Sequence, residues 1–368
     1  MLLLVTRSDV LGGAQRHVAD LARGLVAAGD DVMLACGGDG AVYKDLVAVG
    51  VQLHCLPWLQ RSLAPLDDLR CVPRLMTVIR QLAPDVVHGH STKAGLLGVL
   101  AARAVGVRAL FTAHGWSAIS AARGGRVGVA AAIACHQIGL VAADRVLVLS
   151  RHDEAIARRM RLCRRRALAV LPPPVRDDPR RADPSLAPAR IITIARHDWP
   201  KDGATLIKAL AGLSAKPWSL IWLGSGPQLA ADIALAHRLG IAERIDFCGH
   251  VDDVSDVLAS GQLFVLSSRA EGLPLALIEA QRAGLGAVAS DVGAVAACIG
   301  GGDSGSVVPA GDVLALRAAL GDALGDPVLR QRWGRAARQA FADRPDPDAL
   351  IARLRAYYRG EDPLTGAE

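Results

Sequence analysis

Short runs of valine, isoleucine and leucine alternate with longer stretches rich in alanine and leucine along most of this chain. The alternation predicts a parallel β-sheet with helices on both faces, because each short run is apolar throughout and fits a strand buried on both sides. In the first half the predicted strands are 2–6, 32–36, 51–55, 86–88, 109–112 and 146–149, and the predicted helices are 14–28, 67–82, 91–105, 123–142 and 150–161.

A proline-rich segment interrupts this pattern. Between residues 171 and 190 the sequence LPPPVRDDPRRADPSLAPAR holds six prolines and clustered charge, which can continue neither a helix nor a central strand. A second series follows, with strands predicted at 191–195, 220–223, 245–248, 263–266 and 287–289. A chain of 368 residues also favours about two domains. We therefore expect an α/β protein with two Rossmann-like, doubly wound domains, 1–172 and 190–346, which face each other across a cleft and are joined by a linker at 173–189.

The charge is unevenly distributed between the two halves. Residues 1–171 hold 21 basic and 12 acidic side chains, whereas residues 172–368 hold 21 and 24. The basic half is expected to face something anionic, either a membrane surface or a phosphate-bearing substrate. Six arginines could contact anionic lipid headgroups or form an ordinary solvated surface: 158, 159, 161, 164, 165 and 166. Nucleic acid is not an expected partner, because no reader motif is recognisable and only 4% of the residues are aromatic.

Several features bear on location. The N-terminus MLLLVTRSD lacks the basic leader and cleavage site of a signal peptide, and seven scattered cysteines form no CxxC pair. A cytoplasmic location is therefore expected, with the inner face of the membrane as an alternative. The apolar stretch 127–143 falls short of the ~20 residues needed to span a bilayer, so we expect a buried helix there.

Ligands of open α/β sheets bind at the carboxyl ends of the strands, so candidate site residues are those that follow predicted strands. After the first strand, Gly12 and Gly13 precede a helix whose free backbone amides can meet an anion, although such a turn can also serve only tight packing. Neither this turn nor LGSGPQL at 223–229 completes a dinucleotide fingerprint, and no P-loop is present.

Histidines end two further strands. VVHGHSTKAG places His88 and His90 at a strand end, where they are expected to line the cleft rather than bind a metal, because no cysteine or carboxylate completes a ligand set. FTAHGWSAI places His114 and Trp116 after the next strand, where we expect a polar ring and a flat apolar surface for substrate contact. A structural histidine is the alternative.

The second half contains two stronger signals. ARHDWPKDG sends a buried strand into Arg196 and Lys201, two cations suited to a diphosphate. EGLPLALIE places Glu271 in a loop and Glu279 within an apolar helix, where a carboxylate is costly unless it is hydrogen-bonded. The hydroxyls of a ribose could supply those bonds, and the helix amides could meet phosphates. A salt bridge from Glu279 to an arginine is the alternative.

With these motifs, the chain resembles the GT-B retaining glycosyltransferases, in particular glycosyltransferase family four. EGLPLALIE looks like the E-x7-E motif of that family, ARHDWPKDG like its diphosphate loop, LGSGP like its post-strand glycine turn, and GGAQRH like its N-terminal glycine loop. The resemblance covers nearly the whole chain. In such proteins a last helix often returns to the first domain, as 347–360 could do here.

The resemblance also implies roles for the candidate residues. Arg196 and Lys201 would bind the donor diphosphate, Glu271 the transferred sugar and Glu279 the ribose, with His114 beside the sugar. The other implied donor contacts are Gly12, Gly13, Gly272, Leu273 and Leu275, and the acceptor-side candidates are His88, His90 and Trp116. Gln15 and the pair Trp199 and Pro200 depart from the usual family residues, which leaves acceptor binding more open than donor binding.

The implied reaction is transfer with retention from a nucleoside-diphosphate sugar, UDP favoured over GDP, to a hydroxyl of a glycan or lipid-linked saccharide. No metal is required, because cations and helix amides stabilise the departing diphosphate. Three alternatives remain open: a GT-B sugar-nucleotide 2-epimerase, a two-lobed sugar-binding protein without chemistry, and a hydride-transfer enzyme, which the absent dinucleotide fingerprint disfavours.

Overall fold

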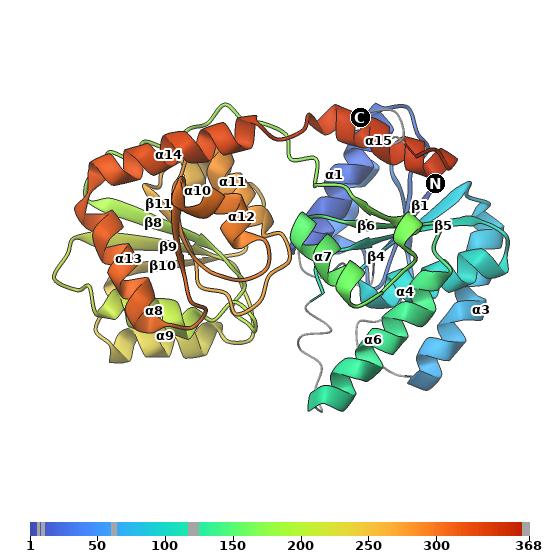
Figure 1. Ribbon diagram of the computed structural model, residues 1–368, viewed down its shortest axis with the longest axis horizontal. Helices are drawn as coiled ribbons and strands as arrows, with labels where there is room; N and C mark the ends of the chain where they lie inside the picture. The colour runs from blue at the N-terminus through green and yellow to red at the C-terminus, as the bar shows by residue number, and fades with distance from the viewer. Residues whose placement is uncertain (6–7, 9–11, 60–64, 117–124, 363–368) are drawn as a thin grey trace. The chain divides into compact units, whose positions relative to one another are not determined.

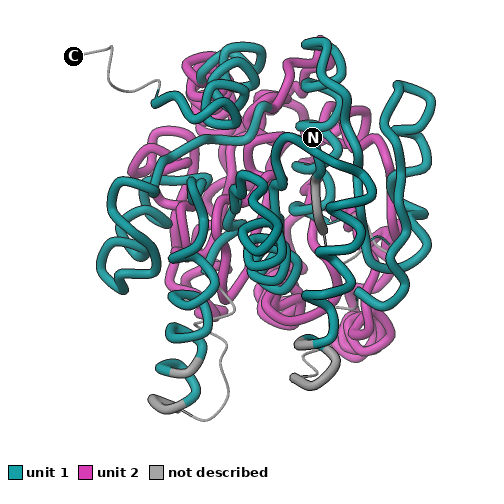
Figure 2. Tube along the Cα trace, turned by 90° about the vertical axis from the view of Figure 1, so that its right-hand side faces the viewer, with its two compact units in different colours: residues 1–174, 345–368 teal, residues 175–344 magenta. Residues whose placement is uncertain are grey.

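The computed structural model describes residues 1–5, 8, 12–59, 65–116 and 125–362. The chain divides into two compact units (Figure 2). Unit 1 comprises Met1–Pro174 together with Pro345–Glu368, and unit 2 comprises Val175–Arg344. Each unit is an α/β structure built on one parallel sheet, so the predicted fold class is confirmed.

Unit 1 has a seven-stranded parallel sheet with the order β3-β2-β1-β4-β5-β6-β7. Its strands are β1 Leu2–Val5, β2 Met33–Cys36, β3 Gln52–Cys55, β4 Val86–His90, β5 Arg108–Ala113, β6 Arg145–Val148 and β7 Leu168–Val170. Its helices are α1 Gly13–Ala27, α2 Lys44–Val47, α3 Pro65–Leu82, α4 Thr92–Ala104, α6 Gly125–Val141, α7 Arg151–Arg159 and α15 Pro347–Arg359, with short 3-10 turns η1 Ala41–Tyr43 and η2 Arg165–Ala167.

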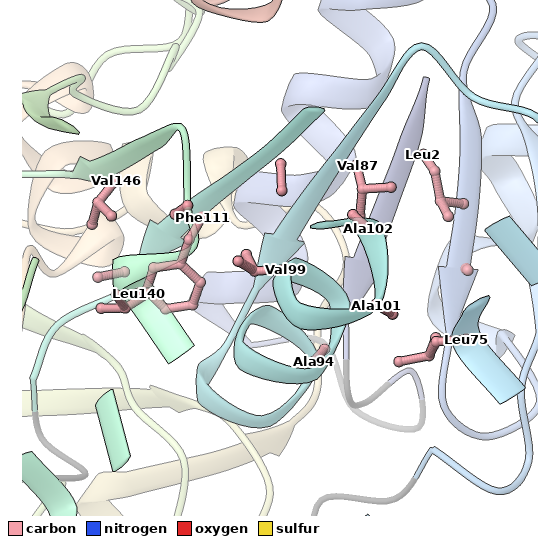
Figure 3. Close-up of a cluster of buried hydrophobic side chains, with 14 of the residues drawn as sticks. Leu2, Leu75, Val87, Ala94, Val99, Ala101, Ala102, Phe111, Leu140 and Val146 are labelled. Carbon is pink, nitrogen blue, oxygen red and sulfur yellow. The ribbon is translucent and has the colours of Figure 1, made fainter. Parts of the chain in front are cut away.

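Helices cover both faces of this sheet, as the continuous apolar strands require. One core lies under α3, α4 and α6, and the other lies under α1 and α15 (Figure 1). Figure 3 shows the first core, in which Phe111 of β5 meets Val99 of α4 and Leu140 of α6. A side chain at Gly95 of α4 would overlap the Phe111 ring, so the helix approaches the sheet closely because it carries a glycine there.

Unit 2 has a six-stranded parallel sheet with the order β10-β9-β8-β11-β12-β13. Its strands are β8 Ala189–Ile194, β9 Trp218–Leu223, β10 Ile245–Gly249, β11 Leu263–Leu266, β12 Ala287–Ser290 and β13 Gly305–Val308. Its helices are α8 Gly203–Ala211, α9 Leu229–Arg238, α10 Ser255–Ala259, α11 Leu275–Ala283, α12 Val295–Ile299, α13 Val313–Gly325 and α14 Pro327–Ala342, with 3-10 turns η3 Ala242–Arg244 and η4 Gly300–Gly302. Two cores again lie on opposite sides of the sheet.

Aspartate side chains begin four of these helices. The carboxylate of Asp202 accepts from the backbone N–H of Thr205 in α8, and Asp312, Asp326 and Asp346 cap α13, α14 and α15 in the same way. Pro327 and Pro347 occupy the first helical positions after two of these caps, where the missing N–H costs nothing. These local signals fix where the helices start.

After unit 2, the chain returns to unit 1, where its last helix, α15, packs. Ile351 of α15 packs against Gly24 of α1, and the Arg355 guanidinium lies 2.9 Å from the Asp30 carboxylate. The proline-rich segment was expected to be a linker at 173–189. From Val175 onward this segment is part of unit 2. There the buried guanidinium of Arg330 donates to the carbonyls of Pro184 and Leu186, each at 2.9 Å.

Helix α6 is less buried than the sequence predicted. Leu140 is buried, but Ile138 is 70% exposed and Val141 is 47% exposed, because only one side of the helix packs on the sheet. Among the described residues, no helix is both long enough and apolar enough to cross a bilayer.

Both sheets contain a point where the strand order reverses. In unit 1 it lies between β1 and β4, and in unit 2 it lies between β8 and β11. In open α/β sheets, ligands bind at such a point, outside the carboxyl ends of the strands. The candidate residues should therefore be sought after β1, β4, β8 and β11.

Candidate functional site

In unit 2, the loops that follow β8 and β11 are tied together at the strand-order reversal. The Ser267 hydroxyl donates to the carbonyls of Lys201 at 3.2 Å and Asp202 at 3.1 Å. The backbone N–H of Arg269 donates to the carbonyl of Pro200 at 2.7 Å. The two sequence motifs that were expected to act together are thus adjacent in space.

An ion pair joins the two loops through their side chains. Lys201 Nζ lies 2.5 Å from Glu271 Oε1, and the Ser268 hydroxyl donates to the same oxygen at 2.5 Å. The Lys201 and Glu271 side chains are only 20% and 10% exposed. Partial burial strengthens such a pair, because less water screens the charges.

Arg196 lies at the start of the loop that follows β8, two residues after Ile194, the last residue of that strand. Its Nη1 lies 3.1 Å from Asp198 Oδ2, and its side chain is about a third exposed. The guanidinium therefore keeps donor positions available beyond the bond to Asp198. Together with Lys201, it provides two cations within one short loop.

A buried histidine within this loop, His197, is held by two neighbouring side chains. The His197 ring is fully buried, stacks on Trp222 with 4.3 Å between centroids, and places Nδ1 2.7 Å from Asp232 Oδ2. This pair was not predicted from the sequence, because Asp232 lies on α9 and no neighbouring residue marks it as a partner of His197. The contact with Asp232 and the stacking on Trp222 hold the His197 ring, and with it the backbone next to Arg196.

The glycine turn after β9 packs against the same loop. A side chain at Gly226 would come within 2.4 Å of the His197 carbonyl oxygen, and the Gln228 N–H donates to that carbonyl at 2.8 Å. Gly224 has a φ of +142°, which only glycine adopts readily. The LGSGP motif therefore supports the Arg196 loop through close backbone contact.

The EGLPLALIE segment has the predicted loop and helix. Glu271 lies in the loop, Pro274 is the N-cap, and Glu279 lies in the middle of α11 with 8% exposure. Glu279 already takes part in an interaction within the protein. Gly272, Leu273 and Leu275 are partly exposed around the start of the helix.

In unit 1, the described part of the first loop includes Gly12 and Gly13. Gly12 is the N-cap of α1 and makes no side-chain capping bond, and Gly13 is the first helical residue. Backbone N–H groups at this end of a 15-residue helix are suited to an anion.

Four histidines meet at the carboxyl ends of β4 and β5. His88 and His90 lie in β4 and His114 directly follows β5, as expected, and the ring of His17 in α1 lies 5.1 Å from that of His114. Burial lowers the pKa of all four imidazoles, to about 3 for His88 and about 4 for His114, with neighbouring histidines adding to the shift for His17, His88 and His90. The cluster is therefore neutral at pH 7. His17 was not anticipated, because it lies in an ordinary amphipathic helix.

His88 is a buried hydrogen-bonding node. Its Nδ1 lies 2.8 Å from the hydroxyl of Tyr358 on α15, and its Nε2 lies 2.7 Å from the Thr112 hydroxyl. The ring has no exposed surface. His88 thus connects α15 to the sheet, whereas His114 is partly exposed.

Trp116 does not form the exposed apolar surface that was expected from the sequence. It is 4% exposed, and its indole N–H donates to the Asp153 carbonyl at 3.0 Å. The ring belongs to the apolar core of unit 1. Among the residues that the structure describes, no group of three or more histidine, cysteine, aspartate or glutamate side chains is arranged to hold a metal ion.

Two family models match the chain, one in each half. The model described as Glycosyltransferase Family 4 matches residues 11–178, and the model described as Glycosyl transferases group 1 matches residues 188–326. The first match lies largely within unit 1, and the second lies within unit 2.

Curated relatives include a UDP-Gal:alpha-D-GlcNAc-diphosphoundecaprenol alpha-1,3-galactosyltransferase of Escherichia coli, 25% identical over 71% of this chain and 72% of that protein. A D-inositol 3-phosphate glycosyltransferase of Streptomyces avermitilis is 29% identical over 69% of this chain and 60% of its own length. An N-acetyl-alpha-D-glucosaminyl L-malate synthase of Bacillus anthracis is matched over only 36% of its length, at 27% identity and 38% of this chain.

Solved structures share the whole fold. Anabaena Alr3699/HepE in complex with UDP and glucose has a TM-score of 0.81 at 17% identity, with 100% of this chain and 99% of that chain covered. WaaG, a glycosyltransferase involved in lipopolysaccharide biosynthesis, has a TM-score of 0.76 at 19% identity, with 98% and 99% covered. The family models in both halves, together with this fold, show that the chain belongs to the GT-B glycosyltransferases of glycosyltransferase family 4.

Proposed function

We propose that this protein is a retaining glycosyltransferase that transfers a hexosyl or N-acetylhexosaminyl group from a nucleoside-diphosphate sugar to a hydroxyl of a glycan or lipid-linked saccharide. The observation that carries the proposal is the ion pair between Lys201 and Glu271, with Arg196 on the same loop, at the strand-order reversal of unit 2. A cation pair beside a carboxylate offers separate partners for a diphosphate and for sugar hydroxyls.

The two cations have complementary roles in binding the diphosphate. Arg196 offers a planar fork that can donate two parallel bonds to phosphate oxygens, and Lys201 offers a point charge on a flexible stem. The backbone amides at the start of α11, near Gly272, Leu273 and Leu275, add donors and a favourable helix dipole. These groups stabilise the diphosphate as it departs, so no enzymatic metal is needed.

The carboxylates recognise hydroxyl groups. Glu271 lies on the loop and accepts from hydroxyls of the transferred sugar, while Glu279 in α11 accepts from the ribose. His114 in unit 1 donates to the sugar, and Gly12 and Gly13 at the start of α1 approach the phosphates. On the acceptor side, His90 and His88 hold His114 in place, and Trp116 supports the same strand end from the core.

The proposed chemistry needs no protein nucleophile. The bond from the anomeric carbon to the diphosphate oxygen breaks, and the acceptor hydroxyl bonds to the same face of that carbon. The proton of the hydroxyl passes to an oxygen of the leaving diphosphate, so the configuration is retained and the products are a glycoside and a nucleoside diphosphate. Arg196 and Lys201 act on the charge that develops on the diphosphate.

UDP is favoured over GDP as the donor nucleotide. The relative in Escherichia coli is named for UDP-Gal and for an acceptor on diphosphoundecaprenol, and the Anabaena structure contains UDP and glucose. A thermal-shift screen of UDP-sugars and GDP-sugars would identify the donor, because the bound nucleotide sugar stabilises the native state. Incubation with saccharide acceptors and NMR of the product anomer would then test transfer and retention. Release of UDP without a glycoside would support a 2-epimerase, and no shift with any nucleotide would contradict donor binding.

We also propose that unit 1 contacts an anionic membrane peripherally. The arginine patch, defined as residues 158, 159, 161, 164, 165 and 166, is exposed throughout. The Gln137 amide of α6 donates to the carbonyls of Met160 and Arg161, so the exposed side of α6, with Ile138, adjoins this patch. Cations beside exposed aliphatic side chains match the headgroup region of an anionic bilayer.

Sedimentation with lipid vesicles would test this contact. The protein should pellet with phosphatidylglycerol vesicles at low salt and stay in solution with phosphatidylcholine vesicles. The double variant Arg164→Glu and Arg165→Glu should lose binding, whereas Arg332→Glu with Arg335→Glu on α14 makes the same charge change elsewhere and should retain it. Equal loss in both would show that net charge alone governs binding and would contradict the patch.

A further inference from the structure

Two neutral histidines share one hydrogen bond at the carboxyl ends of β4 and β5. Nδ1 of His90, the last residue of β4, lies 3.1 Å from Nε2 of His114, which directly follows β5. Burial lowers the pKa of both imidazoles well below pH 7. Each ring therefore carries a single N–H, and one proton lies between the two facing nitrogens.

This proton can belong to either ring, with opposite consequences for the free nitrogen of His114. If His90 donates, His90 has its proton on Nδ1, and His114 keeps its own proton on Nδ1. If His114 donates, His114 Nδ1 is a bare lone pair, and His90 must carry its proton on Nε2. The state of His90 Nε2 therefore decides between the two arrangements.

His90 Nε2 is buried and has no hydrogen-bond partner among the residues that the structure describes. A proton on that atom would be a buried N–H without an acceptor, so the desolvation of this donor would not be compensated by a hydrogen bond. Buried donors without partners are rarer in proteins than acceptors with unused lone pairs. The arrangement in which His90 Nε2 is unprotonated is thus the more stable one.

We infer that His90 is a positioning residue that donates from Nδ1 to His114 Nε2 and thereby holds the proton of His114 on Nδ1. Neighbouring rings hold the orientation of His90 and His114. His88 packs on His90 with 4.2 Å between ring centroids, and His17 meets His114 edge-on with 5.1 Å between centroids. His88 is itself held by Thr112 and Tyr358.

The consequence is that His114 presents a hydrogen-bond donor to the substrate. Its Nδ1 makes no hydrogen bond to any described residue, and the residue is partly exposed. An N–H there fits an oxygen that gains negative charge or a hydroxyl that must be held by its oxygen, and it does not fit another donor. This inference rests on the proposed function, in which His114 lies beside the transferred sugar.

Nitrogen NMR of the histidine side chains tests the proton position directly. In wild-type protein with 15N-labelled histidine, long-range proton–nitrogen correlations distinguish a protonated Nδ1 from a protonated Nε2, and comparison with His114→Ala assigns the ring. We expect His114 to carry its proton on Nδ1 at pH 7.5. A proton on Nε2 would overturn the inference. This readout does not depend on any sugar transfer, so it stands apart from a failure of the proposed function.

Matched variants test the effect on the reaction. His90→Asn keeps an amide N–H near the position of Nδ1, whereas His90→Leu removes it. With UDP-glucose as the probe, His90→Leu and His114→Ala should each lower kcat by about tenfold to a hundredfold, and His90→Asn should stay within about threefold of wild type. The dissociation constant of UDP should stay within about twofold in each variant.

Thermal unfolding separates a positioning role from general damage, with His237→Asn on exposed α9 as the control. If folded His90→Asn is as slow as folded His90→Leu, the donor at Nδ1 has no role and the inference fails. If no variant of His90 changes kcat while His114→Ala does, His114 does not depend on His90, and the inference also fails.

Discussion

Lys201 and Glu271 form an ion pair, with 2.5 Å between Nζ and Oε1, although 70 residues separate them in sequence. Because the Glu271 carboxylate is in direct contact with Lys201 Nζ, it weakens the attraction of Lys201 for a phosphate. Glu271→Gln removes that negative charge with little change in size. We expect UDP to bind about threefold to tenfold more tightly, in line with a gain of about 1 kcal/mol, while sugar transfer falls by about a hundredfold or more.

Calorimetric titration of UDP, together with a transfer assay on the same preparation, would measure both effects of Glu271→Gln. Lys208→Gln on the exposed side of α8 changes a charge nearby without touching the pair and should leave both unaltered. Weaker binding of UDP by Glu271→Gln would mean that this carboxylate supports the nucleotide rather than competing with it.

Arg196 should be sensitive to the shape of its cation as well as to its charge. Arg196→Ala and Lys201→Ala should each weaken binding of UDP and GDP by at least about tenfold, because each removes a charged hydrogen bond to the diphosphate. Arg196→Lys restores the charge without the two-pronged geometry and should recover only part of the affinity. Titrations of the three variants decide the assignment, and unchanged affinity in all of them would remove the diphosphate from this loop.

The strands and helices could be predicted because burial on both faces makes the parallel strands apolar throughout. The two strands that were missed lie at sheet edges: β7 has three residues, and β13 begins with glycine and serine, so neither presents a clear apolar run. Edge strands need less burial, and their sequence signal is correspondingly weak.

Positions after the strands were predictable, but the partners of individual side chains were not. Lys201 and Glu271 follow adjacent strands, so their proximity follows from the fold. By contrast, the bond between His197 and Asp232 depends on how α9 packs, and Trp116 turned inward to reach the Asp153 carbonyl. Such pairings arise from tertiary packing, which periodicity does not encode.

The histidine cluster should make unit 1 sensitive to acid. The pKa of His88 is lowered to about 3 by burial, against 6.5 in the unfolded chain, so the unfolded state binds more protons between these values. Stability is then full above about pH 6.5 and is lost as the pH falls toward the folded pKa, by up to about 1.4 kcal/mol per pH unit for one histidine.

Thermal unfolding between pH 5 and pH 8 would show this loss as a falling Tm. His88→Gln removes the titrating ring, so it should lower the Tm at pH 8, where the bonds to Thr112 and Tyr358 are impaired, yet flatten the decline toward pH 5. His237→Gln on exposed α9 should retain the wild-type slope. An unchanged slope in His88→Gln would show that other groups govern the acid response.

Gly24 provides a test of how α15 is held on unit 1. An alanine in the middle of a helix such as α1 ordinarily stabilises by about 1 kcal/mol relative to glycine. Here, however, a Cβ at Gly24 would lie 2.7 Å from Cδ1 and 2.8 Å from Cγ1 of Ile351, so the Ile351 side chain or the helix that carries it must shift to admit it. Gly24→Ala should therefore destabilise the protein by about 1–3 kcal/mol, as overpacking of a tight core does.

Ile351→Ala should also destabilise the protein, by leaving a cavity of similar cost. The double variant should nevertheless be more stable than the sum of the two losses predicts, because the new methyl group fills space that Ile351 vacates. Urea unfolding of the four proteins measures this coupling, and strict additivity would show that α15 does not rest on Gly24 in solution.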